Sequence, residues 1–97
     1  MKEKEFFVYI LKCSDNTFYT GMTSDLEKRI NEHNNQTHEG YTSKRLPVEL
    51  VYSQKFFDFD EAMRAEKRIK KWSHLKKQAL IDGDFEKIKE LSKKVKK

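Results

Sequence analysis

The chain has 97 residues, of which 36% are hydrophobic and 38% are charged, and its formal net charge is +5. This length supports one modest core, while seven Phe, four Tyr and one Trp argue against disorder along the whole chain. The single cysteine, Cys13, excludes an intramolecular disulfide framework, and no apolar run approaches the roughly 18 residues of a membrane span. We therefore expect a cytoplasmic protein that does not enter a membrane.

The positive charge is concentrated in the C-terminal third. Residues 1–60 hold eight Lys or Arg against ten Asp or Glu, whereas residues 61–97 hold 13 against six. This asymmetry indicates a polyanionic partner, with nucleic acid first and a membrane surface second. The solvated faces of lysine-rich helices would explain the same charges equally well.

Two short stretches near the N-terminus predict a β-hairpin. Residues 6–11 form an apolar run rich in β-formers, and residues 18–20 resume that character after the turn residues 14–17. Ser24 and Glu27 then fit a capping box at the start of a helix over residues 25–34.

Leu26 and Ile30 supply the buried stripe of this first helix, and residues 34–45 are typical of an exposed loop. Pro47 precedes a third strand, expected at residues 48–52. Three more helices are expected after it: one capped by Asp58 or Asp60 that ends near residue 72, one over residues 73–82 before Gly83, and one from about residue 84.

The order of these elements predicts a small α+β domain, with a three-stranded, mostly antiparallel sheet flanked by helices. We expect residues 1–82 to form the domain. Residues 83–97 are expected to form a basic C-terminal helix with a frayed tail.

Glu66 is the unusual residue of the second expected helix. Helical spacing places its carboxylate with the apolar side chains of Ala62 and Ile69 rather than with the basic face. An unpaired carboxylate there is costly, so Glu66 needs a cation, either a basic side chain or a metal. A simple ion pair with Lys70, four residues on, is the plainer alternative.

Arg29 and His33 are four residues apart, so they share one face of the first helix. A guanidinium suits two oxygens of a phosphate, and a neutral imidazole accepts a proton near neutral pH. A surface Arg and His beside a core face is the alternative reading. Tyr9 and Tyr19 lie on one face of the hairpin only if its loop has three residues or a strand carries a bulge.

Together these residues resemble the GIY-YIG nuclease superfamily, and most of all its small stand-alone (YhbQ-like) branch. Val8-Tyr9-Ile10 is similar to the first motif, and Tyr19-Thr20-Gly21 to the second, with Gly21 as the motif glycine. The resemblance covers about residues 5–80. Val8 stands where the family has glycine, and no asparagine follows residue 35; whether Gln78 or another group replaces the family asparagine stays open.

The resemblance implies a metal-dependent endonuclease that hydrolyses phosphodiester bonds of nucleic acid, with DNA favoured over RNA. It implies catalytic roles for Tyr9, Tyr19, Arg29 and His33, and a role for Glu66 in binding Mg²⁺ or Mn²⁺, without a small-molecule cofactor. Tyr9 is the first choice of general base, and His33 replaces it if nearby cations do not lower the tyrosine pKa. The residues expected to contact nucleic acid are Lys44, Arg45, Lys67, Lys70, Lys71, Lys76 and Lys77.

Two other functions fit the same sequence. One is a nucleic-acid-binding module of this fold that no longer cuts, and the other is a membrane-surface or protein-interaction domain. We expect a monomer, and recognition of a specific site would need a protein partner or a structured substrate.

Overall fold

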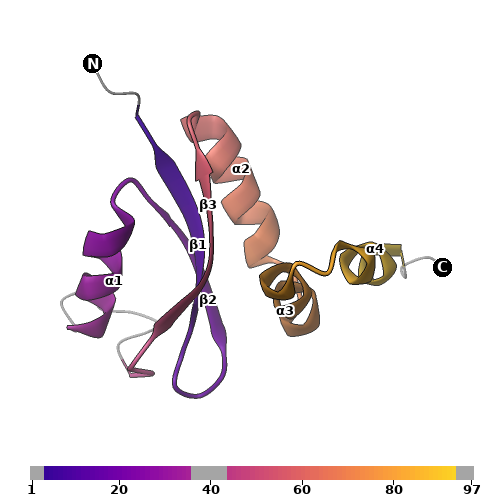
Figure 1. Cartoon of the computed structure of the whole chain (residues 1–97), viewed down its shortest axis with the longest axis horizontal. Helices are drawn as coiled ribbons and strands as arrows, with labels where there is room; N and C mark the ends of the chain where they lie inside the picture. The colour runs from indigo at the N-terminus through magenta and orange to yellow at the C-terminus, as the bar shows by residue number, and fades with distance from the viewer. Residues whose placement is uncertain (1–3, 36–43, 94–97) are drawn as a thin grey trace.

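The computed structural model describes residues 4–35 and 44–93 (Figure 1). Its elements follow in the order β1 (Phe6–Lys12), β2 (Phe18–Thr23), α1 (Leu26–Asn34), β3 (Glu49–Phe56), α2 (Phe59–Lys70), α3 (His74–Asp82) and α4 (Phe85–Lys93). This order confirms the predicted α+β fold. Most of the loop predicted at residues 34–45, and most of the tail predicted to fray, lie outside the described residues.

The three strands form one antiparallel sheet in the order β2-β1-β3. The sheet is therefore wholly antiparallel among the described residues, rather than mostly antiparallel. Because β1 is central and covered on both faces, its run from Val8 to Leu11 is completely buried. This explains why β1 is a continuous apolar segment instead of an alternating one.

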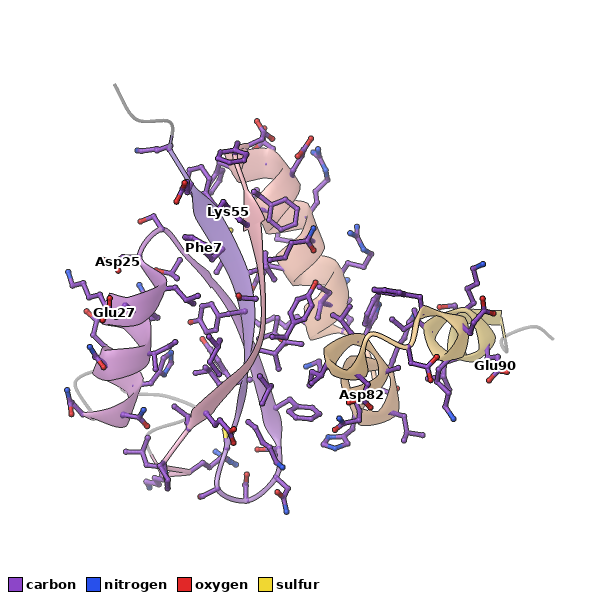
Figure 2. All side chains as sticks on the ribbon, viewed as in Figure 1. Phe7, Asp25, Glu27, Lys55, Asp82 and Glu90 are labelled. Atoms are coloured by element: carbon purple, nitrogen blue, oxygen red, sulfur yellow. The ribbon has the colours of Figure 1, made fainter. Side chains whose placement is uncertain are left out.

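Helices cover both faces of the sheet: α1 lies on one side, and α2 with α3 lies on the other (Figure 1). Side chains fill both spaces (Figure 2). Val8 and Ile10 pack against α2. Tyr9 and Leu11 point to the opposite face, where they pack with Leu26 and Ile30 of α1. The alternation along β1 thus divides the core into two parts.

The N-cap of α1 is Asp25, so the prediction of Ser24 was wrong by one residue. The Asp25 side chain accepts a hydrogen bond from the Lys28 backbone N–H. The hydroxyl of Thr23, which ends β2, accepts a hydrogen bond from the Asp25 backbone N–H at 3.1 Å. This contact fixes the strand-to-helix turn one residue later than the capping-box pattern indicates.

The other helix boundaries follow the sequence signals closely. Asp58 caps α2, Ser73 caps α3, and Gly83 ends α3 with a positive φ of 73°. Strand β3 extends to Phe56, beyond the predicted residue 52, because it pairs with β1 as far as Phe6. Tertiary pairing, rather than local composition, sets the length of this strand.

Asn34, the last residue of α1, ties this helix to the chain that leads into β3. Its side-chain oxygen accepts a hydrogen bond from the Val48 backbone N–H at 2.9 Å, and its amide donates to the Val48 carbonyl at 3.4 Å. The helix that carries Arg29 and His33 is therefore held to the sheet at its C-terminal end.

Candidate active site

The hairpin that carries the two tyrosines has a three-residue loop. The Cys13 N–H donates to the Thr17 carbonyl at 2.9 Å, and Asn16 takes a positive φ of 68° inside the loop. This is a turn followed by a left-handed residue, a common three-residue connection. Tyr9 pairs with Gly21 and Leu11 with Tyr19, so both tyrosines point to the α1 face.

Tyr9 and Tyr19 are neighbours on that face, with ring centroids 6.3 Å apart. The two tyrosines therefore share one face of the hairpin, which the sequence alone did not determine. The phenol of Tyr9 extends over Gly21: a Cβ atom at position 21 would lie 2.6 Å from the Tyr9 hydroxyl oxygen. Only glycine leaves room for this tyrosine, which gives the motif glycine a steric reason.

Helix α1 brings His33 against both tyrosines. The imidazole is 1% exposed, and its Nε2 atom shares a long hydrogen bond of 3.3 Å with the Tyr9 hydroxyl. Its ring also packs edge-on against Tyr19, with centroids 5.3 Å apart. His33 is therefore a buried member of the cluster and not a surface histidine.

Arg29 lies one turn before His33 and is partly exposed, at 33% of its side chain. Its Nε atom is 3.1 Å from Oε1 of Glu32. Arg29 also interacts with the Tyr9 phenol, and both its positive charge and its hydrogen bonding act to lower the tyrosine pKa. It is thus a partly exposed cation beside the buried side chains of Tyr9 and His33.

The Tyr9 pKa is nevertheless raised from 10.0 to about 12. Burial is the largest cause, followed by the nearby Tyr19; the Arg29 guanidinium opposes them, and the negative charge of Glu66 raises the pKa further. At neutral pH Tyr9 is consequently a neutral phenol. The cations of the protein alone do not produce a phenolate.

Glu66 lies on α2, the helix that packs on the opposite face of the sheet. Its side chain is 14% exposed, beside the buried Ala65 and Ile69, as helical spacing predicted. Its Oε2 atom lies 3.0 Å from the Lys70 ammonium, so the ion pair considered as an alternative is present. Its influence on the Tyr9 pKa places both residues within electrostatic range of one another.

The donor set at Glu66 fits a magnesium-type ion. In residues 4–35 and 44–93 no group of three His, Cys, Asp or Glu side chains could hold a metal. Mg²⁺ commonly takes one or two carboxylates and completes its shell with water and substrate phosphate. Lys70 is 55% exposed and flexible, so its ion pair with Glu66 is weak enough to yield to a divalent cation.

The basic residues expected to contact nucleic acid differ in their surroundings. Lys44, Lys67 and Lys71 are exposed. Arg45 pairs with Asp15 of the hairpin at 3.0 Å.

Two lysines of α3 are more enclosed. Lys76 lies over the Trp72 ring at 4.4 Å from its centroid. Lys77 is only 8% exposed, and burial, then the charge of Lys70, lowers its pKa. Of the seven residues, Lys77 is the least accessible to a phosphate.

The sequence alone did not identify Glu32 as a residue of the site, and it could not predict the hollow beside it. The i,i+3 spacing between Arg29 and Glu32 was the available signal for their ion pair. A hollow of about 120 Å³ opens beside both residues, lined also by Thr23, Ser24, Asp25 and Lys28.

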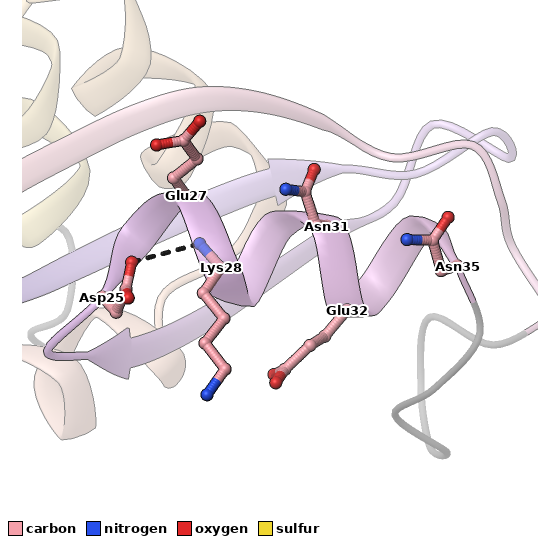
Figure 3. A pocket seen from close by; sticks show the side chains of 6 residues that line it. All are labelled: Asp25, Glu27, Lys28, Asn31, Glu32 and Asn35. Carbon is pink, nitrogen blue, oxygen red and sulfur yellow. Dashed lines mark hydrogen bonds between the residues drawn. The ribbon is translucent and has the colours of Figure 1, made fainter.

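A larger hollow of about 370 Å³ runs along the outer side of α1 (Figure 3). It is lined by Asp25, Glu27, Lys28, Asn31, Glu32 and Asn35. None of the two tyrosines, Arg29, His33 or Glu66 lines it. This larger hollow is therefore separate from the cluster.

The fold and this cluster define a small α+β domain with a polar, half-buried site at the β1–β2 hairpin. The model of the GIY-YIG catalytic domain matches residues 5–79. The chain therefore belongs to the GIY-YIG family, which confirms the resemblance seen in the sequence. Among the described residues, no helix has the length and apolar character that a membrane crossing requires.

Similar proteins are small chains of the same kind. The UPF0213 protein YazA of Bacillus subtilis (strain 168) is 42% identical over 82 residues, covering 84% of this chain and 83% of YazA. The solution NMR structure of EF2693 from E. faecalis is 36% identical, with a TM-score of 0.60, and covers 84% of this chain and 88% of that one. The NMR structure of the UPF0213 protein BH0048 from Bacillus halodurans is 40% identical, with a TM-score of 0.54, covering 80% and 83%.

Proposed function

We propose that the protein is a metal-dependent endonuclease that hydrolyses phosphodiester bonds of nucleic acid, with DNA as the substrate. The observation that carries this proposal is the meeting of Tyr9, Tyr19, Arg29 and His33 on one face of the hairpin, with Glu66 in electrostatic range. Membership of the GIY-YIG family supports nuclease-type chemistry. The site joins a phosphate-binding cation, a proton acceptor and a metal-binding carboxylate.

Glu66 is the proposed ligand of Mg²⁺ or Mn²⁺. Such an ion, when bound, neutralises the phosphate and stabilises the leaving oxygen. Because Glu66 is only 14% exposed, its carboxylate is less hydrated than a surface glutamate, which favours a bound cation. Without metal, the Lys70 ammonium pairs with the Glu66 carboxylate. When metal binds to Glu66, Lys70 is released and contacts a neighbouring phosphate.

Arg29 is the proposed phosphate clamp. Its planar guanidinium matches two oxygens of one phosphate, and it is the partly exposed cation beside the Tyr9 phenol. As negative charge grows on the non-bridging oxygens, a donor placed in this way contributes roughly 3–4 kcal/mol to transition-state stabilisation.

The proton of the attacking water passes through Tyr9 to His33. With a pKa of about 12, Tyr9 is protonated at neutral pH and cannot start as a phenolate. His33 is buried, and its Nε2 atom is next to the Tyr9 hydroxyl. The phenol therefore gives its proton to Nε2 while its oxygen takes the proton of water, so His33 is the final base.

The exposed basic residues Lys67 and Lys71, with Lys44, supply affinity for the phosphate backbone that does not depend on sequence. A nucleic-acid-binding module that no longer cuts is the second candidate. The observation that favours it is the ion pair of Glu66 with Lys70, which satisfies the carboxylate without a metal.

The decisive experiment uses labelled single-stranded, duplex and branched DNA and RNA, with and without Mg²⁺ or Mn²⁺. We expect the wild-type protein to cleave at least one DNA only with metal, and Glu66→Ala to abolish cleavage. Glu61→Ala is the matched control, since Glu61 is an exposed acid on the same helix. A wild-type protein that binds these substrates but cuts none would establish the binding module instead.

A further inference from the structure

The guanidinium of Arg29 interacts with two side chains. Glu32 lies three residues further along α1, and its Oε1 atom is 3.1 Å from the Arg29 Nε atom. Arg29 also interacts with the Tyr9 phenol, whose pKa it lowers. Two contacts of different origin, one within the helix and one to the sheet, therefore restrict a side chain that has many rotamers when free.

The choice of atom matters for the phosphate. A guanidinium has five N–H donors in a planar fork, and the Glu32 carboxylate lies closest to the Nε atom of that fork. The terminal amino groups are then left for the two oxygens of a phosphate. A carboxylate bound end-on to those groups would instead compete with the substrate.

Glu32 and Arg29 are both about one-third exposed and border the same hollow of about 120 Å³, at the junction of β2 and α1. The pair is thus at the entrance to the cluster and not within its buried part. An exposed i,i+3 pair contributes little to folding stability. Because the pair includes Arg29, the proposed phosphate clamp, it bears on substrate binding more than on folding stability.

We propose that Glu32 is a positioning residue, which orients Arg29 so that its terminal amino groups face the scissile phosphate. This inference rests on the proposed function. Glu32 touches neither substrate nor metal in this role, and its effect on turnover passes through Arg29. Its loss lowers the turnover number and leaves KM nearly unchanged, because phosphates bound along the basic helices still provide most of the affinity.

The first test observes the pair directly and needs no activity. Arginine Nε–H signals are recorded by two-dimensional ¹H-¹⁵N NMR, and the Arg29 signal is assigned by its absence in Arg29→Lys. We expect this signal to be shifted and slow to exchange in the wild type and in Glu32→Gln, which retains an acceptor oxygen. In Glu32→Ala it should move to the position of solvent-exposed arginines; an unchanged signal would overturn the proposal.

The second test uses cleavage of a substrate that the panel of DNA and RNA molecules identifies. Glu32→Ala is expected to lower kcat by about tenfold, and Glu32→Gln to restore most of it. In the Arg29→Ala background, Glu32→Ala should cause no further loss. An equal loss in both backgrounds would overturn the positioning role, since Glu32 would then act without Arg29.

The matched control is Glu27→Ala, which removes the same charge from the same helix. Figure 3 shows Glu27 and Glu32 projecting from opposite sides of α1. We expect Glu27→Ala to retain the Arg29 signal and kcat, and a loss equal to that of Glu32→Ala would attribute the effect to helix charge. If the wild type cuts no substrate, the proposed function fails, while the NMR comparison still decides whether Glu32 holds Arg29.

Discussion

The phenol of Tyr9 lies directly over Gly21, its partner across the β1–β2 ladder. A Cβ atom at position 21 would be 2.6 Å from the phenolic oxygen and 2.7 Å from the ring carbon that carries it. Tyr9 is fully buried, so its rigid ring has little space into which to move. The glycine is required by the packing of the tyrosine, and its own φ is not positive.

Gly21→Ala should therefore push the Tyr9 phenol away from His33. We expect a loss of about 1–3 kcal/mol in the free energy of unfolding, the usual cost of overpacking a core. Cleavage should be lost with it, because the hydrogen bond between Tyr9 and His33 no longer forms. Urea denaturation and the cleavage assay measure the two effects.

Gly83→Ala is the control for this substitution. Gly83 has a positive φ of 73° and no atom within 4 Å of a Cβ added there, so it lacks a packing partner. An alanine in this left-handed conformation costs about 1–2 kcal/mol, yet cleavage should persist. Equal activity in the two variants would show that Gly21 has no special relation to Tyr9.

Tyr9→Phe removes the hydroxyl through which the water proton passes to His33. We expect cleavage to fall by about 10²–10⁴-fold, the range for loss of a proton-transferring group. The fold should persist, with a loss of no more than about 1–2 kcal/mol in the free energy of unfolding, because only hydrogen bonds are removed. Initial rates and circular dichroism of the variant provide the comparison.

Tyr52→Phe serves as the control, since Tyr52 packs on the α2 side of the sheet and its hydroxyl donates to Gln54 at 3.0 Å. This variant should cleave at the wild-type rate. Wild-type turnover by Tyr9→Phe would remove Tyr9 from the reaction and leave His33 to act without a relay.

The raised pKa of Tyr9 predicts a loss of stability in strong alkali. The phenol titrates at about 12 in the folded protein and at 10.0 without the perturbation, so the folded state holds its proton more tightly. This contribution is fully present below pH 10 and disappears as the pH rises from 10 to 12. We expect the free energy of unfolding to drop by about 1–2 kcal/mol over this range, after allowance for solvent screening.

The contribution of Tyr9 to this loss of stability is the difference in unfolding free energy between wild type and Tyr9→Phe. It is measured by urea denaturation at several pH values. Tyr52, whose pKa is also raised by burial, contributes equally to both proteins. Parallel stability curves for the two proteins between pH 9 and 12 would contradict a raised Tyr9 pKa. Absorbance of tyrosinate offers an independent titration of the same group.

The sequence predicted the elements and their order, because most carry local signals: turn residues at 14–17, Asp58 or Asp60 as a cap, and Gly83 after a helix end. It could not predict that β3 continues to Phe56, since that length depends on pairing with β1. The register that joins Tyr9 to Tyr19 was likewise undetermined. It depends on the left-handed conformation of Asn16, one residue in a loop of polar residues.

The residues of the candidate site were found from their types and spacing, whereas their surroundings were not. Burial of His33 to 1% depends on how α1 docks against the sheet, and this follows from tertiary contacts. The same holds for Tyr9, whose pKa is raised by burial more than Arg29 lowers it. The sequence likewise did not indicate that Lys77, which we expected to contact nucleic acid, is only 8% exposed.

Replacing Thr20 by valine is expected to stabilise the protein. Its hydroxyl oxygen is buried and has no hydrogen-bond partner among the described residues, although the side chain is only 2% exposed. Thr20→Val keeps the shape and removes the unsatisfied group, so we expect the free energy of unfolding to rise by about 1 kcal/mol. Thermal and urea unfolding measure the change.

The opposite sign is expected for Thr17→Val in the same hairpin. The Thr17 hydroxyl donates to Asp15 at 2.6 Å, and valine would lose this hydrogen bond. Destabilisation by Thr20→Val would mean that the Thr20 hydroxyl has a partner, such as a buried water molecule, and the reason given for the gain would be wrong.

The last prediction concerns Asn34, which connects the helix of Arg29 and His33 to the chain before β3. Asn34→Ala removes both hydrogen bonds to the Val48 backbone. The backbone N–H of Val48, a residue only 6% exposed, then loses its partner. We expect a loss of about 1–3 kcal/mol in the free energy of unfolding. Amide hydrogen exchange should accelerate most in α1 and at Val48, because this contact holds the helix end.

Asn31→Ala is the control on the same helix. Asn31 is exposed and borders the outer hollow of α1 (Figure 3), so its truncation should change stability by no more than about 0.5 kcal/mol. Faster exchange at Val48 in Asn34→Ala but not in Asn31→Ala would establish the connection. If both variants leave exchange at Val48 unchanged, α1 is held by the packing of Leu26, Ile30 and His33 alone.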